Sequence, residues 1–283
     1  MLKNRILTAS ILAPLVILAI LLLPDHWFAL LWGIAIAVCA WEWSNLAGLA
    51  ATPARAAFVA VCVGAMTSYQ QWAGEVEEWL AWPVVAWWVL FSVLLRKIPA
   101  KLAAVQYPVA VRLVVGAFIL VTSWILMVWT QHNLRPPQLL YLFLLVWLAD
   151  IAAYFAGKRW GLTKLCPEIS PGKTVEGVYG ALGAVVLLAL ATATALYAFG
   201  EEGSSFASFD PVKWLDFVML SLGVALFSVV GDLFESLAKR VRGVKDSGAI
   251  LPGHGGLLDR LDSLVAAVSL YYAGSKYLEI FFQ

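Results

Sequence analysis

Apolar residues occur along this chain in nine long runs separated by short polar segments. The runs cover residues 6–23, 28–50, 56–72, 79–95, 109–130, 139–156, 177–199, 213–232 and 261–282. A membrane-spanning helix needs about 20 apolar residues, and none of the runs shows the two-residue alternation of a transmembrane strand. Only helices and closed barrels satisfy their backbone groups in lipid. The pattern therefore predicts an all-α polytopic integral membrane protein with about nine transmembrane helices.

Composition agrees with this class of protein. Of the 283 residues, 62% are hydrophobic and 13% are charged, whereas soluble domains carry about 25% charged residues. The first run follows Lys3 and Arg5, as in a signal peptide. It is longer than the apolar region of such a peptide, and no A-x-A cleavage site follows it. We therefore expect a retained first helix.

Basic residues are distributed unevenly between alternate loops. With the N-terminus in the cytosol, 16 of the 19 Lys and Arg residues fall at cytosolic helix ends, and only Arg135, Lys213 and Lys276 remain outside. Membrane proteins carry such an excess on their cytosolic side. We expect a multi-pass protein of the cytoplasmic (inner) membrane, with a cytosolic N-terminus and, after nine spans, a C-terminus outside.

The chain shows no internal repeat and no linker long enough to separate two domains, so residues 1–283 are expected to form one membrane domain. The spans of the N-terminal half contain almost no ionisable residues, and Glu42 is the exception. We expect residues 1–130 to serve as a scaffold and residues 139–283 to form the catalytic half.

The segment 232–262 concentrates charges of both signs between the last two runs. Its acidic residues are Asp232, Glu235, Asp246, Asp259 and Asp262, and its basic residues are Lys239, Arg240, Arg242, Lys245 and Arg260. Charges at the edge of a bilayer are costly and are usually functional or paired. Mg²⁺ relieves repulsion between carboxylates and binds substrate phosphates, while Lys and Arg bind phosphate oxygens. This combination indicates phosphoryl-type chemistry on a lipid.

Two short motifs accompany this segment. Residues 252–256 allow backbone N–H groups to approach an anion, and His254 has two interpretations, a general acid or an ordinary loop histidine. Residues 170–174 resemble half of a P-loop but lack its strand and first glycine, which excludes a Walker motif. We expect Lys173 and Thr174 to contact phosphate at the start of the next helix. Asp150 and Tyr154 share a helix face directed toward the same surface, with a hydrogen-bonded helix pair as the alternative.

The spacing of residues 236–262 resembles the signature of the phosphatidate cytidylyltransferase family, also called CDP-diacylglycerol synthases. The matching positions are Ser236, Lys239, Arg240, Lys245, Asp246, Gly248, Leu251, Pro252, His254, Gly255, Gly256, Asp259, Arg260 and Asp262. Asp232 and the segment 170–177 are similar to those of bacterial members. The resemblance implies transfer of CMP from CTP to phosphatidic acid with release of pyrophosphate. It also implies Mg²⁺, a possible assisting K⁺, a homodimer, and a polar cavity open to cytosol and bilayer.

The resemblance further implies metal ligation by Asp232 and Asp259, with Asp246 close by. We predict catalytic roles for Asp232, Asp246, Asp259, Lys239 and Lys245. We predict substrate binding by Ser236, Arg240, Arg260, His254, Gly255, Gly256, Lys173, Thr174, Asp150 and Tyr154. No nucleic-acid partner is expected.

Three alternatives compete with this interpretation. One is another CTP-dependent lipid enzyme, such as a polyprenol kinase or an ether-lipid CDP synthase. A second is an ion-coupled transporter, which predicts acidic residues in mid-span and often a repeated architecture. The third is a lipid-binding scaffold whose basic loops grip anionic headgroups, and this protein would need no aspartate cluster.

Overall fold

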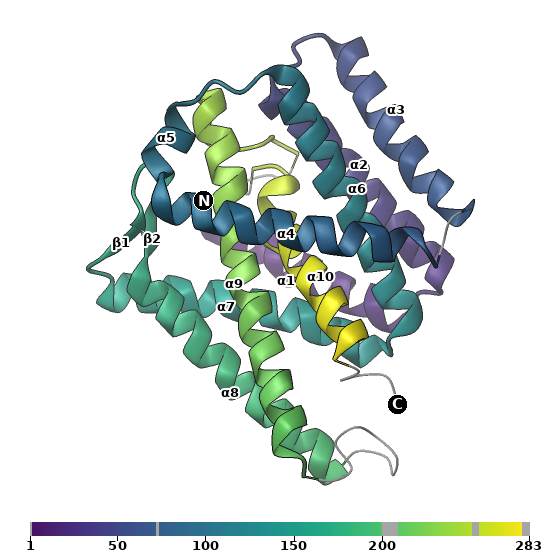
Figure 1. The fold of residues 1–283 in the computed structure, drawn as a ribbon, viewed down its shortest axis with the longest axis vertical. Helices are drawn as coiled ribbons and strands as arrows, with labels where there is room; N and C mark the ends of the chain where they lie inside the picture. Colours follow the sequence, from purple (N-terminus) through teal and green to yellow (C-terminus); the bar gives the residue numbers. More distant parts are fainter. Residues whose placement is uncertain (1, 72–73, 200–208, 251–254, 279–283) are drawn as a thin grey trace.

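A computed structural model describes residues 2–71, 74–199, 209–250 and 255–278 as a bundle of long helices with one β-hairpin (Figure 1). The elements are α1 (Leu2–Leu22), α2 (Asp25–Ala47), α3 (Thr52–Ser68), the 3₁₀ turn η1 (Tyr69–Gln71), α4 (Val76–Lys97), α5 (Pro99–Ala104), α6 (Val109–Asn133), α7 (Pro136–Trp160), β1 (Lys164–Cys166), β2 (Ser170–Thr174), α8 (Val175–Phe199), α9 (Pro211–Arg242) and α10 (Leu258–Tyr277). Each predicted run coincides with one long helix.

Six helices of the described chain are long and apolar enough to cross a membrane: α2, α4, α6, α7, α8 and α9. The protein is therefore an all-α polytopic membrane protein, as predicted. In α1 the part whose side chains are described, Ser10–Leu22, is apolar but shorter than these six helices. The number of nine spans and the absolute orientation stay predictions.

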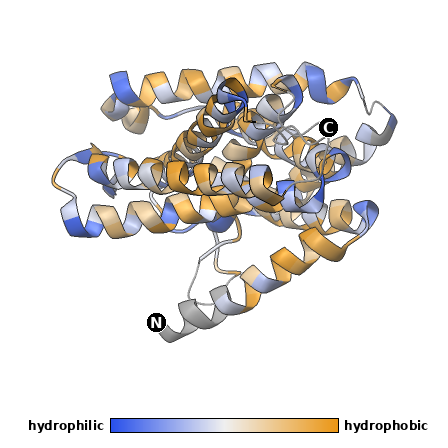
Figure 2. Cartoon of the chain, turned by 90° about the horizontal axis from the view of Figure 1, so that it is seen from below, coloured by the Kyte–Doolittle hydropathy of each residue, from blue (hydrophilic) through white to orange (hydrophobic). Residues whose placement is uncertain are grey.

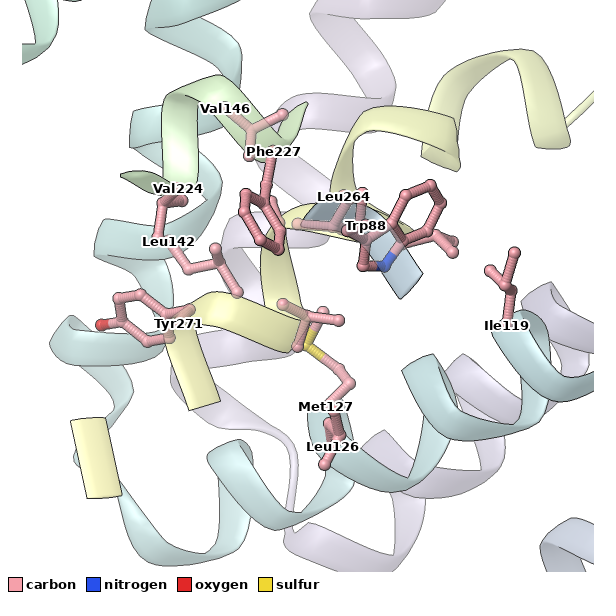
Figure 3. Packing of buried hydrophobic residues seen from close by; sticks show 14 of the residues in the cluster. Trp88, Ile119, Leu126, Met127, Leu142, Val146, Val224, Phe227, Leu264 and Tyr271 are labelled. Atoms are coloured by element: carbon pink, nitrogen blue, oxygen red, sulfur yellow. The ribbon is translucent and has the colours of Figure 1, made fainter. Parts of the chain in front are cut away.

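Helix α10 lies in the middle of the bundle, and this position explains why it is less apolar than its neighbours. Thirteen of its residues are buried, among them Ser263, Ser269 and Tyr271. Tyr271 donates a hydrogen bond from its hydroxyl to the carbonyl of Gln138 in α7. Figure 3 shows Tyr271 and Leu264 among the buried apolar side chains of the other helices. A helix enclosed by protein can carry polar groups that find partners there.

Large apolar side chains also cover the outer surface of the bundle. Trp79, Leu187 and Val114 are each more than two-thirds exposed, and Figure 2 shows hydrophobic residues along much of the length of the helices. Monomeric soluble proteins rarely expose contiguous apolar patches of this kind. The surface is that of a protein surrounded by lipid.

Contacts between helix ends show which ends lie at the same side of the bundle. At one end of the bundle, Arg242 Nε of α9 donates to the carbonyl of Asn45 in α2 (3.1 Å), and Arg55 Nε donates to Ser44 Oγ (3.1 Å). At the other end, His132 Nδ1 of α6 lies 2.5 Å from Asp25 Oδ2. The C-terminal ends of α2 and α9 and the start of α3 therefore lie together, at the opposite end of α2 from the contact of Asp25 with α6.

Helix α9 continues well past the predicted end of its span at residue 232. It ends at Arg242, and Gly243 follows with a left-handed φ of 74°. The N–H of Gly243 donates to the carbonyl of Arg240, and the N–H of Val244 donates to that of Lys239. Glycine is the residue that adopts this C-terminal conformation without strain. The extension carries the charged residues 232–242 on a continuous helix.

The β-hairpin was not predicted. Strands β1 and β2 pair antiparallel, with Lys164 opposite Thr174 and Cys166 opposite Ser170. Glu176 accepts the backbone N–H of Thr163 at the base of the hairpin. The strands are short and contain Pro171 and Gly172, which are depleted in strands, so the sequence pattern did not indicate them.

Candidate active site

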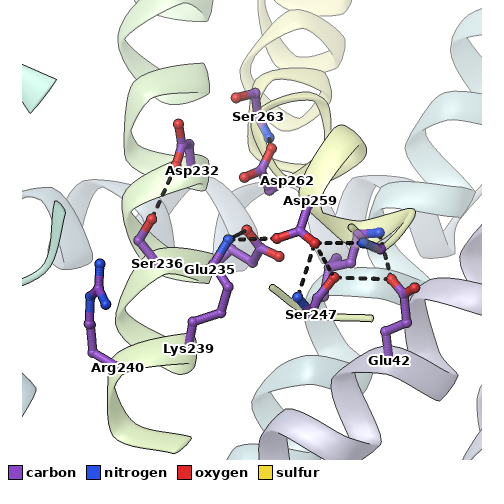
Figure 4. A network of polar contacts seen from close by, with 12 residues as sticks. Glu42, Asp232, Glu235, Ser236, Lys239, Arg240, Ser247, Asp259, Asp262 and Ser263 are labelled. Carbon is purple, nitrogen blue, oxygen red and sulfur yellow. Dashed lines mark hydrogen bonds and ion pairs between the residues drawn. The ribbon is translucent and has the colours of Figure 1, made fainter. Parts of the chain in front are cut away.

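Helices α9 and α10 are joined by a lysine held between two carboxylates (Figure 4). Lys239 Nζ lies 2.5 Å from Glu235 Oε2, one turn earlier in α9, and 2.7 Å from Asp259 Oδ1 in the first turn of α10. The three side chains are largely buried, with exposed fractions of 14%, 2% and 7%. Glu235 and Lys239 therefore lie on the face of α9 that points toward α10.

Asp259 uses its second oxygen to close the loop between the two helices. Its Oδ2 accepts the backbone N–H of Ser247 (3.0 Å), the hydroxyl of Ser247 (2.9 Å) and the N–H of Gly256 (2.8 Å). Both oxygens of this predicted metal ligand are thus engaged by protein donors. In this geometry Asp259 holds Lys239 and the loop between α9 and α10 in place.

The glycines of the signature allow this close approach. Gly255 has a left-handed φ of 85°, and a Cβ added there would lie 2.8 Å from Asp259 Oδ2. The N–H of Gly256, which we predicted to bind a substrate anion, is donated to Asp259 instead. The third predicted member of this loop, His254, lies outside the described residues.

The hairpin is fastened to α9 on the other side of the site. Lys173 Nζ lies 2.7 Å from Asp232 Oδ2, and Ser236 Oγ donates to Asp232 Oδ1 at 3.2 Å. Arg240 Nε donates to the carbonyl of Ile169 at 3.0 Å. The structure therefore brings together the two charged motifs that we predicted to share a surface.

Asp150 of α7 joins this group, whereas Tyr154 does not. Asp150 interacts electrostatically with Lys173, Asp232 and Arg260. Tyr154 is exposed, and its ring lies 5.4 Å from that of Phe155 with Lys158 nearby. In the described chain, Tyr154 has no hydrogen bond or ion pair to the signature residues.

Thr174, predicted to contact phosphate, is buried and has a structural role. Its hydroxyl accepts the N–H of Gly177 (3.1 Å) at the start of α8. It also packs against two further glycines, because a Cβ added at Gly157 or Gly161 would lie 2.9 Å from its Oγ1. Helix capping and close packing thus account for this residue.

Lys245 and Asp246 lie at the edge of the site. Both are exposed, and their side chains make no hydrogen bond or ion pair with any residue that the structure describes. Asp246 lies beside Gly255, whose added Cβ would be 3.3 Å from Asp246 Cβ. Both side chains remain accessible to a ligand from solution.

Two carboxylates that we did not include among the site residues lie deeper. Glu235 has one oxygen, Oε1, that is buried without a partner in the described structure. Its carboxyl group contacts that of Asp262, which also interacts electrostatically with Asp232 and Asp150. Two carboxyl groups in contact repel unless a proton or a cation lies between them. Their three-residue spacings from Asp232 and Asp259 were the signal that could have identified them.

A preformed metal site is not present in the described residues, since no group of three His, Cys, Asp or Glu side chains has that geometry. The donor chemistry nevertheless fits a hard cation. Asp232, Glu235 and Asp262 offer carboxylate oxygens in one region, and Glu235 Oε1 lacks a protein partner. Mg²⁺ binds through one or two carboxylates and completes its shell with water and phosphate.

The scaffold half contributes one residue that sequence analysis left without a role. Glu42 of α2 is 2% exposed, and its carboxylate accepts the N–H groups of Leu257 (3.1 Å) and Leu258 (2.8 Å). It also accepts the Ser247 hydroxyl at 3.2 Å. The N-terminal half therefore contacts the signature directly.

Comparison with known proteins agrees with this geometry. The model of the cytidylyltransferase family matches residues 3–278. The chain is 39% identical to a phosphatidate cytidylyltransferase of Pseudomonas aeruginosa over 286 residues, which cover 96% of both chains. It is 35% identical to one of Haemophilus influenzae over 289 residues, covering 96% of this chain and 97% of that one. The chain belongs to the cytidylyltransferase family.

Proposed function

We propose that this chain is a phosphatidate cytidylyltransferase, which transfers CMP from CTP to phosphatidic acid and releases pyrophosphate. One observation carries the proposal: at the junction of α9 and α10, Lys239 lies between the buried carboxylates of Glu235 and Asp259. The names of the two relatives that match over nearly the whole chain point to the same substrates. A lipid-binding scaffold would not need such a buried acidic cluster.

The reaction is a displacement at phosphorus. A phosphate oxygen of the lipid attacks the α-phosphorus of CTP, a new P–O bond forms, and the bond to the β-phosphate oxygen breaks. The second pKa of a phosphate monoester is about 6, so the nucleophile is largely ionised at neutral pH. The attack therefore depends on positioning and charge neutralisation rather than on a strong general base.

The basic residues of the site provide this neutralisation. Lys173 and Lys239 are held by carboxylates in the structure, and substrate phosphates would compete with these carboxylates for the two ammonium groups. Arg260 and Lys245 are exposed at the rim, where they meet an incoming triphosphate. Lysine and arginine both bind phosphate oxygens through charge-assisted hydrogen bonds.

We also propose that the site uses Mg²⁺. Asp232, Glu235 and Asp262 would hold it, and the predicted ligands Asp246 and Asp259 border the same region. Bound there, the cation would neutralise charge on the phosphates of both substrates. K⁺ as a second cation remains part of the proposal.

The two substrates are proposed to arrive by different routes. CTP is soluble and enters from the cytosol, on the side where the arginine-rich helix ends lie. Phosphatidic acid enters sideways, because removing its acyl chains from the bilayer costs about 0.8 kcal/mol per CH₂. The location in the inner membrane with a cytosolic site, and assembly as a homodimer, belong to the same proposal.

The test is to incubate the purified protein with radiolabelled CTP, phosphatidic acid and Mg²⁺, and to separate the lipids. We expect a labelled nucleotide-linked lipid when the label is in the cytidine or the α-phosphate. Label transferred only from the γ-phosphate to a polyprenol would indicate a kinase instead. A labelled product from an ether-linked acceptor, but none from phosphatidic acid, would indicate the ether-lipid enzyme.

A further inference from the structure

Helix α2 reaches the site from the opposite half of the chain through a single buried carboxylate. Glu42 precedes Ser247, which lies within the signature segment 236–262, by 205 positions, yet Glu42 Oε2 lies 3.2 Å from the Ser247 hydroxyl oxygen. Figure 4 shows Glu42 beside Ser247, with Asp259 on the other side. We propose that Glu42 is a positioning residue. It fixes Ser247 in the loop between α9 and α10 and the first turn of α10, and it thereby orients Asp259 and Lys239.

The first part of the argument concerns the start of α10. The first N–H groups of a helix have no partner within the helix, and a negative charge is stabilised there by the helix dipole. Glu42 Oε1 accepts the N–H of Leu257 and Oε2 accepts that of Leu258. No side chain of the N-cap residue supplies this hydrogen bond, so the cap comes from another helix.

The second part concerns Ser247, which links two carboxylates. Its hydroxyl oxygen lies 2.9 Å from Asp259 Oδ2 and 3.2 Å from Glu42 Oε2. A serine hydroxyl has one proton and donates to one acceptor at a time, so the two carboxylates compete for it. The orientation of Asp259 is therefore coupled to the position of Glu42.

The third part concerns space. A Cβ added at Gly248 would lie 2.3 Å from Glu42 Oε1, and one added at Gly256 would lie 2.5 Å from Oε2. Both distances are shorter than a van der Waals contact allows. These two glycines of the signature therefore leave room for the carboxylate of Glu42. A larger residue at either position would collide with it.

The position of α2 is itself fixed by neighbouring contacts. Trp43 stacks on Phe234 of α9 with ring centroids 5.4 Å apart, and its Nε1 donates to the carbonyl of Arg112 in α6. Glu42 is thus held by a helix that is packed against α9 and α6. A carboxylate on such a rigid support can position the loop accurately.

The test compares Glu42→Gln with Glu77→Gln. Glu77 is an equally buried glutamate of the N-terminal half, and its Oε1 accepts the N–H of Gly74 rather than a group of the signature. Glutamine keeps the length of Glu42 but turns an NH₂ group toward backbone N–H donors. With cytidylyl transfer as the proposed function, we expect kcat to fall about 10-fold or more in Glu42→Gln, with KM for CTP changed about threefold at most. We expect both parameters to stay near wild type in Glu77→Gln.

A second readout does not depend on activity. The exposed residue Ala249 is replaced by cysteine, while the native Cys39, Cys62 and Cys166 are buried. We expect a polar thiol reagent to modify Ala249→Cys about 10-fold faster in the Glu42→Gln background than in the Glu77→Gln background, because the loop is released. Loss of transfer activity in the wild type would overturn the proposed function, but it would leave this comparison intact.

A third variant keeps the proposal testable if Glu42→Gln fails to fold. Ser247→Ala removes only the hydroxyl between the two carboxylates, and we expect a kcat about 3- to 10-fold lower with an unchanged Tm. The double variant should be no more than about twofold slower than the slower single variant, because residues that act as one unit are not additive. Unchanged kcat together with unchanged thiol reactivity in Glu42→Gln, or full additivity with Ser247→Ala, would overturn the positioning role. If Glu42→Gln does not fold, an unchanged kcat in Ser247→Ala would overturn it.

Discussion

Lys173 of strand β2 and Asp232 of helix α9 form an ion pair, in which Nζ and Oδ2 are 2.7 Å apart. This ion pair joins the hairpin to α9. Both side chains are partly exposed, at 24% and 32%, so substrate phosphate can reach the ammonium group. We expect Lys173→Ala to raise KM for CTP or lipid about 10-fold. Steady-state kinetics of this variant, with the exposed Lys164→Ala on β1 as control, check this. Equal KM values for the two variants would contradict a role in phosphate binding.

Lys239→Met is expected to destabilise the protein as well as inactivate it. The substitution leaves the buried carboxylates of Glu235 and Asp259 without their cation. Breaking a buried ion pair by removing one partner costs about 3–5 kcal/mol. Thermal unfolding in detergent should show a clearly lower Tm, whereas Lys245→Ala, at an exposed position, should not change it. A Tm equal to wild type in Lys239→Met would contradict the buried arrangement.

Lys245→Ala is expected to impair turnover without loss of stability. Its exposed ammonium group has no ion pair in the described chain, so its charge is available to phosphate. The control is Arg96→Ala, which removes an equally exposed basic residue from the end of α4. We expect kcat/KM for CTP to fall about 10-fold in Lys245→Ala and less than twofold in Arg96→Ala. Equal effects would mean that Lys245 contributes only to topology.

Removal of Mg²⁺ should abolish turnover reversibly. Dialysis against a chelator, followed by titration with Mg²⁺, measures the concentration that restores half of the activity. In Asp232→Asn we expect this concentration to rise about 10-fold or activity to be lost, since one ligand of the cation is removed. Near-normal activity of Asp232→Asn at every Mg²⁺ concentration would defeat its assignment as a ligand.

Absolute orientation can be tested at the two ends of α9. Ala249 follows the C-terminal end of this helix and Val212 lies at its start, and both are exposed. A membrane-impermeant thiol reagent should modify Ala249→Cys from the cytosolic side and Val212→Cys from the outer side. The reverse pattern in intact cells and inverted vesicles would show that the protein is inserted the other way.

The helices could be predicted because long apolar runs determine them locally. The extension of α9 to Arg242 lies beyond the apolar run that predicted this helix, and the left-handed Gly243 marks its end. The hairpin could not be predicted, because strands of three and five residues carry too little pattern. The capping role of Thr174 was not predicted, because a lysine–threonine pair before a helix resembles a phosphate loop, whereas here the hydroxyl caps α8.

In the site, the contacts that could not be predicted were mainly those between residues far apart in the sequence. The charges of residues 232–262 indicated the chemistry of the site. The sequence could not reveal that both carboxylate oxygens of Asp259 accept hydrogen bonds, from Lys239, Ser247 and Gly256. These hydrogen bonds depend on the path of the loop between α9 and α10. The contact between Glu42 and residues 247–258 spans more than 200 positions and has no signature in periodicity.

The central, comparatively polar α10 has a consequence for how the protein is made. Helices enter the bilayer from the translocon according to their apolarity, and α10 is not among the described helices apolar enough to cross a membrane. Among the described helices it comes last in chain order. We therefore expect its entry to depend on α4, α6, α7 and α9, which it contacts in the folded protein. Because Asp259 and Asp262 lie on α10, we expect the proposed site to be complete only after α10 has packed against α9.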